Sequence, residues 1–194
     1  GKEKRVDFLR GYGYQGGAGR GDWSKSIAEL GYGSELKKEI LKPGNWTIGM
    51  GGFGEVLPYH ENKMYLDYNK IDVFGLPKII FDAEFKENEK RMKEDWKIQA
   101  AEMLEKAGFK EVSIFDSNAP IGKGIHEMGT ARMGKDPETS VLNKYNQIHS
   151  VPNVFVTDGS FMTSSGTQNP SLTYMAFTAR AVDYAVSELK KMNL

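Results

Sequence analysis

The stretch HEMGTARMG at 126–134 contains the side chain best suited to catalysis, His126, which is one of three histidines in the chain. An unperturbed imidazole titrates near pH ~6.5, so it suits a general base that is neutral at rest and cationic during turnover. The neighbouring glycines let the backbone approach a flat ligand closely. These residues indicate acid–base chemistry at His126. The alternative is a partly buried histidine that hydrogen-bonds to backbone near the end of a strand.

A second stretch, DGSFMTSSGTQNPSLT at 158–173, leads from an apolar strand into a helix. Asp158 and Gly159 follow the strand, and small, flexible or polar side chains then run to Asn169. Crossings of this kind bind cofactors in α/β proteins, because a helix N-terminus offers unpaired N–H groups to an anion. The sequence therefore favours a ligand beside this crossing. On the alternative interpretation, Asn169 only caps the helix and Pro170 occupies its first position.

The elements that must position these stretches can be predicted from periodicity. A helix is predicted over 88–107, followed by Gly108 as its C-terminal cap residue. Strands are predicted over 110–116 and 153–159. The final helix is expected to begin at Asn169 and Pro170 and to carry an apolar face. The residues of this face are Met175, Ala179, Val182, Val186 and Leu189.

Earlier in the chain, short apolar or aromatic segments at 46–59, 63–68 and 78–85 alternate with turn residues. This pattern predicts an antiparallel meander. Residues 34–41 predict a short helix. The glycine-rich segment 11–33 predicts irregular loops, because glycine adopts positive φ without steric cost.

The glycine motif GYGYQG at 11–16 matches a dinucleotide-binding loop in its letters alone, because no buried strand precedes it and no helix follows. His60, His126 and His149 have no partners at metal-ligand spacing, so no metal site is expected. The motif and the histidines outside 126–134 therefore give no second candidate site.

Composition narrows the possible classes of protein. The 194 residues include 26 basic and 26 acidic side chains and no cysteine. The balanced charge argues against a nucleic-acid partner, and the lack of cysteine excludes disulfides and thiolate chemistry. No apolar run approaches the ~20 residues that span a bilayer. We expect a soluble chain, cytoplasmic or periplasmic, without a membrane span.

The two stretches, with the amphipathic helix that ends the chain, closely resemble the C-terminal signature of the glucose-methanol-choline (GMC) flavoprotein oxidoreductases. The resemblance is specific over 126–189. It is looser over 46–115, where it points to the branch that acts on sugars, sugar acids and polyols. It implies FAD as the cofactor and an alcohol or sugar as the substrate.

The resemblance also implies roles for individual residues. His126 corresponds to the base that takes the alcohol proton while hydride passes to flavin N5, and Asn169 corresponds to the second catalytic position, which hydrogen-bonds the substrate oxygen. The cofactor-binding positions that it implies are Asp158, Gly159, Asn169, Pro170 and Ser171.

The expected fold is α+β: a mostly antiparallel substrate-domain sheet with flanking helices, plus the final strand and helix of an incomplete FAD-binding α/β domain. Residues 1–145 are assigned to the substrate-binding part, with 1–45 as an irregular glycine- and aromatic-rich segment, and residues 146–194 to the FAD-binding part. GMC proteins bind the ADP half of FAD near their own N-terminus, and no such unit occurs here. We expect a C-terminal fragment that needs the missing FAD domain as its partner, and that alone is inactive and prone to self-association. The electron acceptor is left open.

Two other functions stay open. The first is a non-catalytic carbohydrate-binding or interaction domain that retains the motif as structure. The second is an enzyme with lyase or other non-redox sugar chemistry. Binding of flavin separates the first from an oxidoreductase, and reduction of that flavin by a polyol separates the second.

Overall fold

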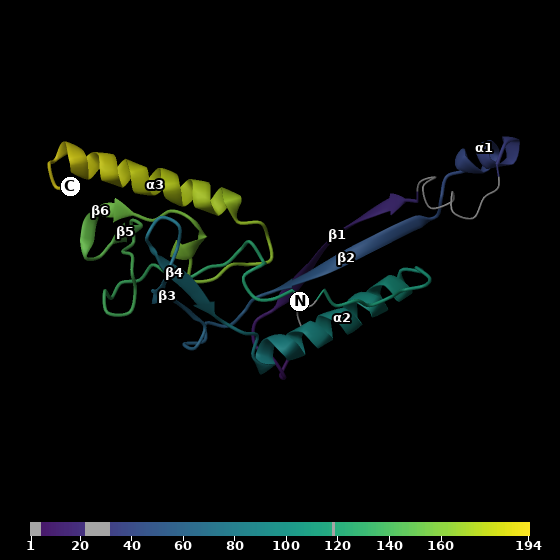
Figure 1. Cartoon of the computed structure of the whole chain (residues 1–194), viewed down its shortest axis with the longest axis horizontal. Helices are drawn as coiled ribbons and strands as arrows, with labels where there is room; N and C mark the ends of the chain where they lie inside the picture. Colours follow the sequence, from purple (N-terminus) through teal and green to yellow (C-terminus); the bar gives the residue numbers. More distant parts are fainter. Residues whose placement is uncertain (1–4, 22–31, 118) are drawn as a thin grey trace.

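The computed structural model describes residues 5–21, 32–117 and 119–194 (Figure 1). Three antiparallel strand pairs, two long helices and one short helix account for its main elements. In chain order they are β1 (Tyr12–Arg20), α1 (Ser34–Ile40), β2 (Trp46–Gly54), β3 (Lys63–Ile71), β4 (Pro77–Asp82), α2 (Glu87–Lys106), β5 (Gln147–Ile148), β6 (Val151–Phe155), the 3₁₀ turn η2 (Gly159–Phe161) and α3 (Ser171–Lys190).

The α+β class and the antiparallel pairing are confirmed. Among the described residues, β1 pairs with β2, β3 with β4, and β5 with β6, as three separate two-stranded sheets rather than one larger sheet. The predictions of β2, β3, β4, α1 and α2 are confirmed within a few residues of their bounds.

Two predictions of local structure are wrong. The segment expected to be irregular contains β1, which pairs with β2 over its whole length, from Tyr12 opposite Gly54 to Arg20 opposite Trp46. Residues 22–31 of that segment lie outside the described residues. Residues 110–116 are not a strand, because they run beside α2, where Asp116 forms ion pairs with Lys93 at 2.7 Å and Lys97 at 3.1 Å.

The β1–β2 ribbon packs one face on α2 through aromatic side chains and glycines. Tyr12 and Trp96 meet edge to face at 5.9 Å, and the Tyr14 hydroxyl donates to the Trp96 carbonyl at 2.7 Å. Gly52 lies opposite Tyr14 and leaves room for the indole, since a Cβ there would lie 2.8 Å from Trp96 Cδ2. The ribbon then extends beyond α2 as an arm with α1 at its far end (Figure 1).

Replacing Gly52 by alanine is expected to lower the free energy of unfolding by about 1–3 kcal/mol, because the added methyl overpacks the contact with Trp96. Gly49→Ala on the same strand is the matched control, since a Cβ at Gly49 meets no atom within 4 Å. Chemical denaturation of the two variants checks this prediction. Equal stabilities would show that the indole does not depend on the gap at Gly52.

The Tyr12 hydroxyl donates to Asp95 Oδ2 at 2.5 Å. Burial, followed by the hydrogen bond to Asp95, raises the pKa of Tyr12 above its ordinary value near ~10. The folded protein therefore holds this proton more tightly than the unfolded chain. The resulting stability is present below pH ~10 and is lost as the pH rises toward the folded-state pKa.

We expect the Tyr12→Phe variant to be less stable than the parent near neutral pH, because it lacks the bond to Asp95. Above pH ~10 the parent should lose stability more steeply than this variant, because only the parent has the Tyr12 phenol, whose pKa the fold raises. Denaturation curves measured from neutral to alkaline pH test the difference in slope. Parallel losses in the two proteins would contradict the prediction.

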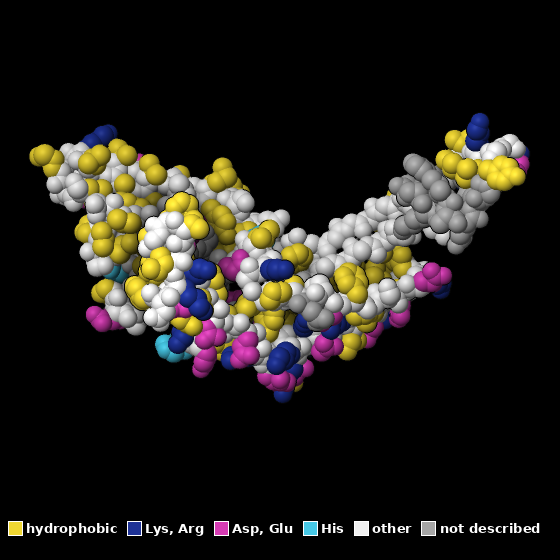
Figure 2. Space-filling model, viewed as in Figure 1, with side chains coloured by type: hydrophobic (Ala, Val, Ile, Leu, Met, Phe, Trp, Pro, Cys, Tyr) yellow, Lys and Arg dark blue, Asp and Glu magenta, His cyan; other side chains and the backbone are white. Residues whose placement is uncertain are grey.

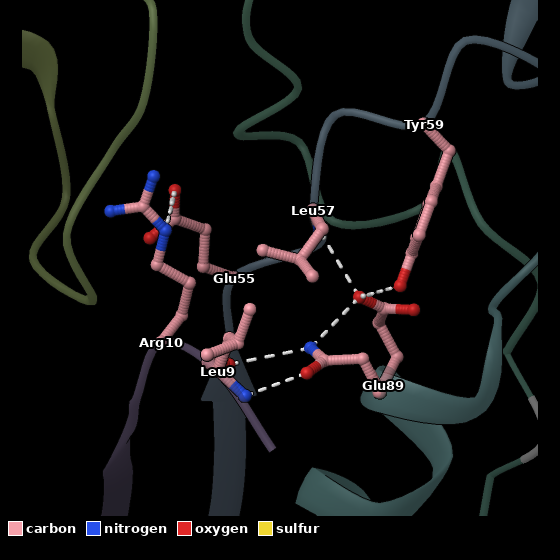
Figure 3. Close-up of polar contacts among 7 residues, drawn as sticks. Leu9, Arg10, Glu55, Leu57, Tyr59 and Glu89 are labelled. Atoms are coloured by element: carbon pink, nitrogen blue, oxygen red, sulfur yellow. Dashed lines mark hydrogen bonds and ion pairs between the residues drawn. The ribbon is translucent and has the colours of Figure 1, made fainter.

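The first turn of α2 is organised by a buried carboxylate, that of Glu89, which is 7% exposed (Figure 3). Its Oε2 accepts from the Lys86 backbone N–H at 3.0 Å, which closes the start of the helix. Its Oε1 accepts from the Leu57 N–H at 3.1 Å and from the Tyr59 hydroxyl at 3.2 Å. Glu89 thus ties the segment after β2 to α2 through these hydrogen bonds.

The other end of α2 matches the sequence prediction. Gly108 has φ +92°, and the Phe109 N–H donates to the Leu104 carbonyl at 3.1 Å while the Gly108 N–H donates to the Glu105 carbonyl at 3.0 Å. This double pattern is a Schellman motif, which satisfies two carbonyls that the helix leaves free.

A second packed region forms beneath α3. The Tyr184 ring of α3 stacks on Tyr145 at 3.8 Å, with 4° between the planes, and Ala181 is buried. Asn146 is fully buried, and its Nδ2 donates to the Val156 carbonyl at 2.9 Å. These contacts attach the β5–β6 hairpin to one face of the helix.

The opposite face of α3 is exposed, and Figure 2 shows apolar side chains along it. All five residues predicted for the apolar face are exposed, together with Leu172. The accessible surface of the chain is 14860 Å². A compact monomer of 21.7 kDa exposes about 9,200 Å² by the usual scaling with mass. The chain therefore presents far more surface than a self-contained domain of its size.

Within the described part of the chain, none of the helices combines the length and the apolar character needed to cross a membrane.

Candidate active site

The two stretches singled out in the sequence lie side by side. The Ala131 N–H donates to the Ser160 carbonyl at 3.0 Å, and the Met133 N–H donates to the Phe161 carbonyl at 2.9 Å. Backbone hydrogen bonds therefore hold the segment 126–134 against η2. Asp158 caps η2, because its Oδ1 accepts from the backbone N–H and from the hydroxyl of Ser160.

Helix α3 covers this junction with aromatic side chains. Phe161 is 2% exposed, stacks on Phe177 at 4.7 Å and meets Tyr174 edge to face at 6.4 Å. These three rings come from η2 and from the first two turns of α3. They fix the start of the helix directly over the Asp158-Gly159 turn.

Three segments meet at Gly159. A Cβ on this residue would lie 2.7 Å from the Tyr174 hydroxyl and 3.2 Å from both the Glu127 carbonyl oxygen and Met128 Sδ. The Tyr174 hydroxyl lies 3.7 Å from the same sulfur atom. Burial, and then the charges of Asp158 and Glu127, raise the pKa of Tyr174, so its phenol stays protonated.

His126 lies one residue before this three-way contact and is half-buried. Within the described residues its imidazole makes no hydrogen bond, so the alternative of a histidine bonded to backbone is not what the structure shows. His149 differs, because its Nε2 lies 3.1 Å from the hydroxyl of Ser140.

The start of α3 differs from the prediction. Pro170, which is buried, is the N-cap residue, and its carbonyl accepts the first helical bond from the Tyr174 N–H at 3.1 Å. Among the described residues no side chain caps the helix, and its first turn has no acidic residue. The interpretation of Asn169 as the N-cap is therefore wrong: the residue lies one position earlier, exposed, and its amide makes no hydrogen bond within the described chain.

The site is a surface formed by neighbouring segments. Two hollows of the described structure, one along α2 and one beside Tyr145 and Tyr184, are lined by neither His126 nor Asn169. No group of three or more metal-ligating side chains is found among the residues that the structure describes.

Sequence analysis missed Tyr174 and Phe161, which hold the two stretches together. Both are aromatic residues of a kind common in protein cores, so hydrophobic periodicity alone predicts only a packing role for them. The tyrosine four residues after Pro170 was the available signal, because i, i+4 spacing places it over the start of the helix.

Comparison with known proteins identifies the family. The model of the GMC oxidoreductase family matches residues 58–178, so the chain belongs to this family. It is 40% identical over 135 residues to a 2-methyl-1,2-propanediol dehydrogenase from Mycolicibacterium austroafricanum, covering 68% of this chain and 24% of that protein.

Two further relatives differ in substrate. Paromamine 6'-oxidase from Streptomyces fradiae is 32% identical over 132 residues, which are 68% of this chain and 24% of that protein. The fructose dehydrogenase large subunit from Gluconobacter japonicus is 27% identical over 159 residues, which are 82% of this chain and 29% of that protein. The chain thus spans about a quarter of the length of the curated relatives it matches. Members of the family are flavoproteins that use FAD.

Proposed function

We propose that this chain is the substrate-facing C-terminal part of an FAD-dependent oxidoreductase that oxidises a CH–OH group of a polyol, a sugar or a sugar acid. The observation that carries the proposal is the attachment of segment 126–134 to η2 under the first turns of α3. It brings the His126 stretch to the same junction as the helix start that follows Asn169.

His126 is proposed to accept the hydroxyl proton of the substrate. Its imidazole is half-buried and has no hydrogen-bond partner among the described residues, which leaves a ring nitrogen available to an alcohol. The Asn169 amide is likewise free and exposed, and it is proposed to donate its N–H to the substrate oxygen. The base would then act on an oxygen whose position is already fixed.

The start of α3 fits the electron-rich edge of a flavin. It has no side-chain cap and no acidic side chain in its first turn, so its backbone N–H groups and its partial positive charge are available. Pro170 and Ser171 form this start, and Asp158 and Gly159 lie in the turn beneath it. When bound, FAD supplies the acceptor for the hydride that leaves the alcohol carbon.

The exposed face of α3 suits the proposed assignment of residues 146–194 to the FAD-binding part. Leu172, Met175, Val182 and Leu189 on this face are each more than half exposed, and apolar surface of this kind is normally covered by a partner. We propose that the FAD-binding part of the full-length protein covers this face. The isolated chain would then bind FAD weakly, be inactive and self-associate.

The function is tested with the full-length protein mixed anaerobically with a panel of polyols, sugars and sugar acids. The proposal expects the flavin spectrum to bleach with at least one of them, and not with the matched compound whose reacting hydroxyl is methylated. A protein that purifies without flavin would favour a carbohydrate-binding module. Bound flavin that no alcohol reduces would favour non-redox chemistry.

A further inference from the structure

The two faces of strand β1 have different partners. Tyr12 and Tyr14 point toward α2, as described above. Side chains alternate between the faces of a strand, so Gly13 and Gln15 belong to the opposite face. That face meets the loop at 163–169, which joins η2 to α3 and descends toward the inner end of the ribbon (Figure 1).

Both residues of this second face contact Thr167. Gln15 Nε2 donates to the Thr167 carbonyl at 2.9 Å, across 152 residues of chain. Gly13 lies directly under the same side chain, since a Cβ there would come within 2.8 Å of Thr167 Oγ1 and 3.0 Å of its Cβ. A glycine at 13 therefore sets how closely the loop approaches the ribbon.

Little else holds the loop. Among the described residues, the bond from Gln15 is the only hydrogen bond between 163–169 and another part of the chain, and the bond from the Ser165 hydroxyl to the Gly166 carbonyl is local. The loop carries Asn169 two residues after Thr167. Within the described part of the chain, the side chain of Asn169 itself makes no hydrogen bond that would fix its place.

We propose that Gly13 and Gln15 are positioning residues: through Thr167 they hold the loop so that the Asn169 amide faces the substrate. This inference rests on the proposed function, which assigns Asn169 to the substrate oxygen. It gives the glycine-rich ribbon a part in catalysis, although neither residue touches the reacting atoms. It also links α2, which packs on one face of β1, to the loop on the other face.

The test compares flavin reduction by substrate in variants of the full-length, FAD-loaded protein. Gln15→Ala, and Gln15→Glu, which keeps the size but replaces the donor amide by an acceptor, are each expected to lower the limiting rate about 3- to 10-fold, the effect of losing one neutral hydrogen bond. Gly13→Ala should lower it at least as much, because the methyl displaces Thr167. Gly17→Ala is the matched control, since a Cβ there meets nothing within 4 Å and the parent rate is expected.

The decisive comparison uses the Asn169→Ala variant as the parent to which Gln15→Ala is added. If Gln15 acts through Asn169, adding Gln15→Ala to Asn169→Ala causes no further loss, whereas a general loosening of the fold would lower the rate by the same factor again. Amide hydrogen exchange provides a second readout: exchange over 163–169 should be faster in Gln15→Ala than in Gly17→Ala.

The outcomes separate the two ideas. If Asn169→Ala slows flavin reduction but the Gln15 and Gly13 variants do not, the positioning inference is overturned and the proposed function stands. Full additivity in the double variant also overturns the inference. If Asn169→Ala itself leaves the rate unchanged, the proposed role of Asn169 fails, and the inference fails with it.

Discussion

Flavin reduction in the full-length protein is expected to slow by about 10²-fold or more when His126 is replaced by alanine. This substitution removes the proposed base, and within the described structure no other imidazole lies on the segments that meet at Gly159. Bound FAD should change little, because the proposed contacts to the cofactor come from 158–159 and 169–171. Stopped-flow measurement of flavin reduction, together with the FAD content of each preparation, checks both statements.

His60→Ala is the matched control for this experiment. His60 is exposed in the turn between β2 and β3, and within the described residues it makes no hydrogen bond. The rate of flavin reduction should equal that of the parent. Equal rates in the His126 and His60 variants would remove His126 from its proposed role.

The second large effect is expected at Asn169. Alanine at this position removes the proposed hydrogen bond to the substrate oxygen, and losing one such donor costs on the order of 10²-fold in rate. Stability should not change, because the Asn169 side chain neither caps α3 nor bonds elsewhere in the described chain. Loss of a capping side chain would instead cost ~1 kcal/mol. Kinetics and chemical denaturation of the same preparation test both parts.

Asn146→Ala provides the contrasting asparagine. Asn146 is fully buried, donates to the Val156 carbonyl at 2.9 Å and accepts from Arg180 at 3.4 Å. Removing its amide leaves the Val156 carbonyl without this donor, while Arg180 keeps its hydrogen bond to the Lys144 carbonyl, and the loss is expected to cost about 1–3 kcal/mol of stability. A protein destabilised by Asn169→Ala to the same extent would show that position 169 has a structural duty and would weaken the kinetic argument.

The sequence predicted the helices best, because their signals are local. The apolar periodicity that predicts α2 and the glycine that ends the helix, Gly108, can both be recognised from residues a few positions apart. The hairpin of β3 and β4 was predicted for a similar reason, from two apolar runs and the turn between them.

Strand β1 could not be predicted, because its partners lie far away in the chain. Its sequence is rich in glycine, and Trp96, which lies far along the chain, packs against Tyr12 and over Gly52 and Gly54 of the ribbon. The segment 110–116 shows the converse case. It has apolar alternation, but ion pairs from Asp116 hold it beside α2 and no strand pairs with it in the described structure.

The proposed catalytic residues were found from short motifs, and their roles stay predictions. The packing contacts that join the two motifs could not be predicted from the sequence. Gly159 fits beneath Tyr174, and Gly13 of β1 lies beneath Thr167. Each contact joins segments far apart in the chain, so the residues next to either glycine in the sequence do not indicate which side chain packs on it.

Because Pro170 rather than Asn169 is the N-cap residue of α3, the side chain at position 169 is not needed to stabilise the start of the helix. The amide there can be exchanged, for instance for an imidazole, with little expected effect on stability, and under the proposed function the exchange would change the contact with the substrate oxygen. Such a site is a natural place to diversify an enzyme library without first screening for folding.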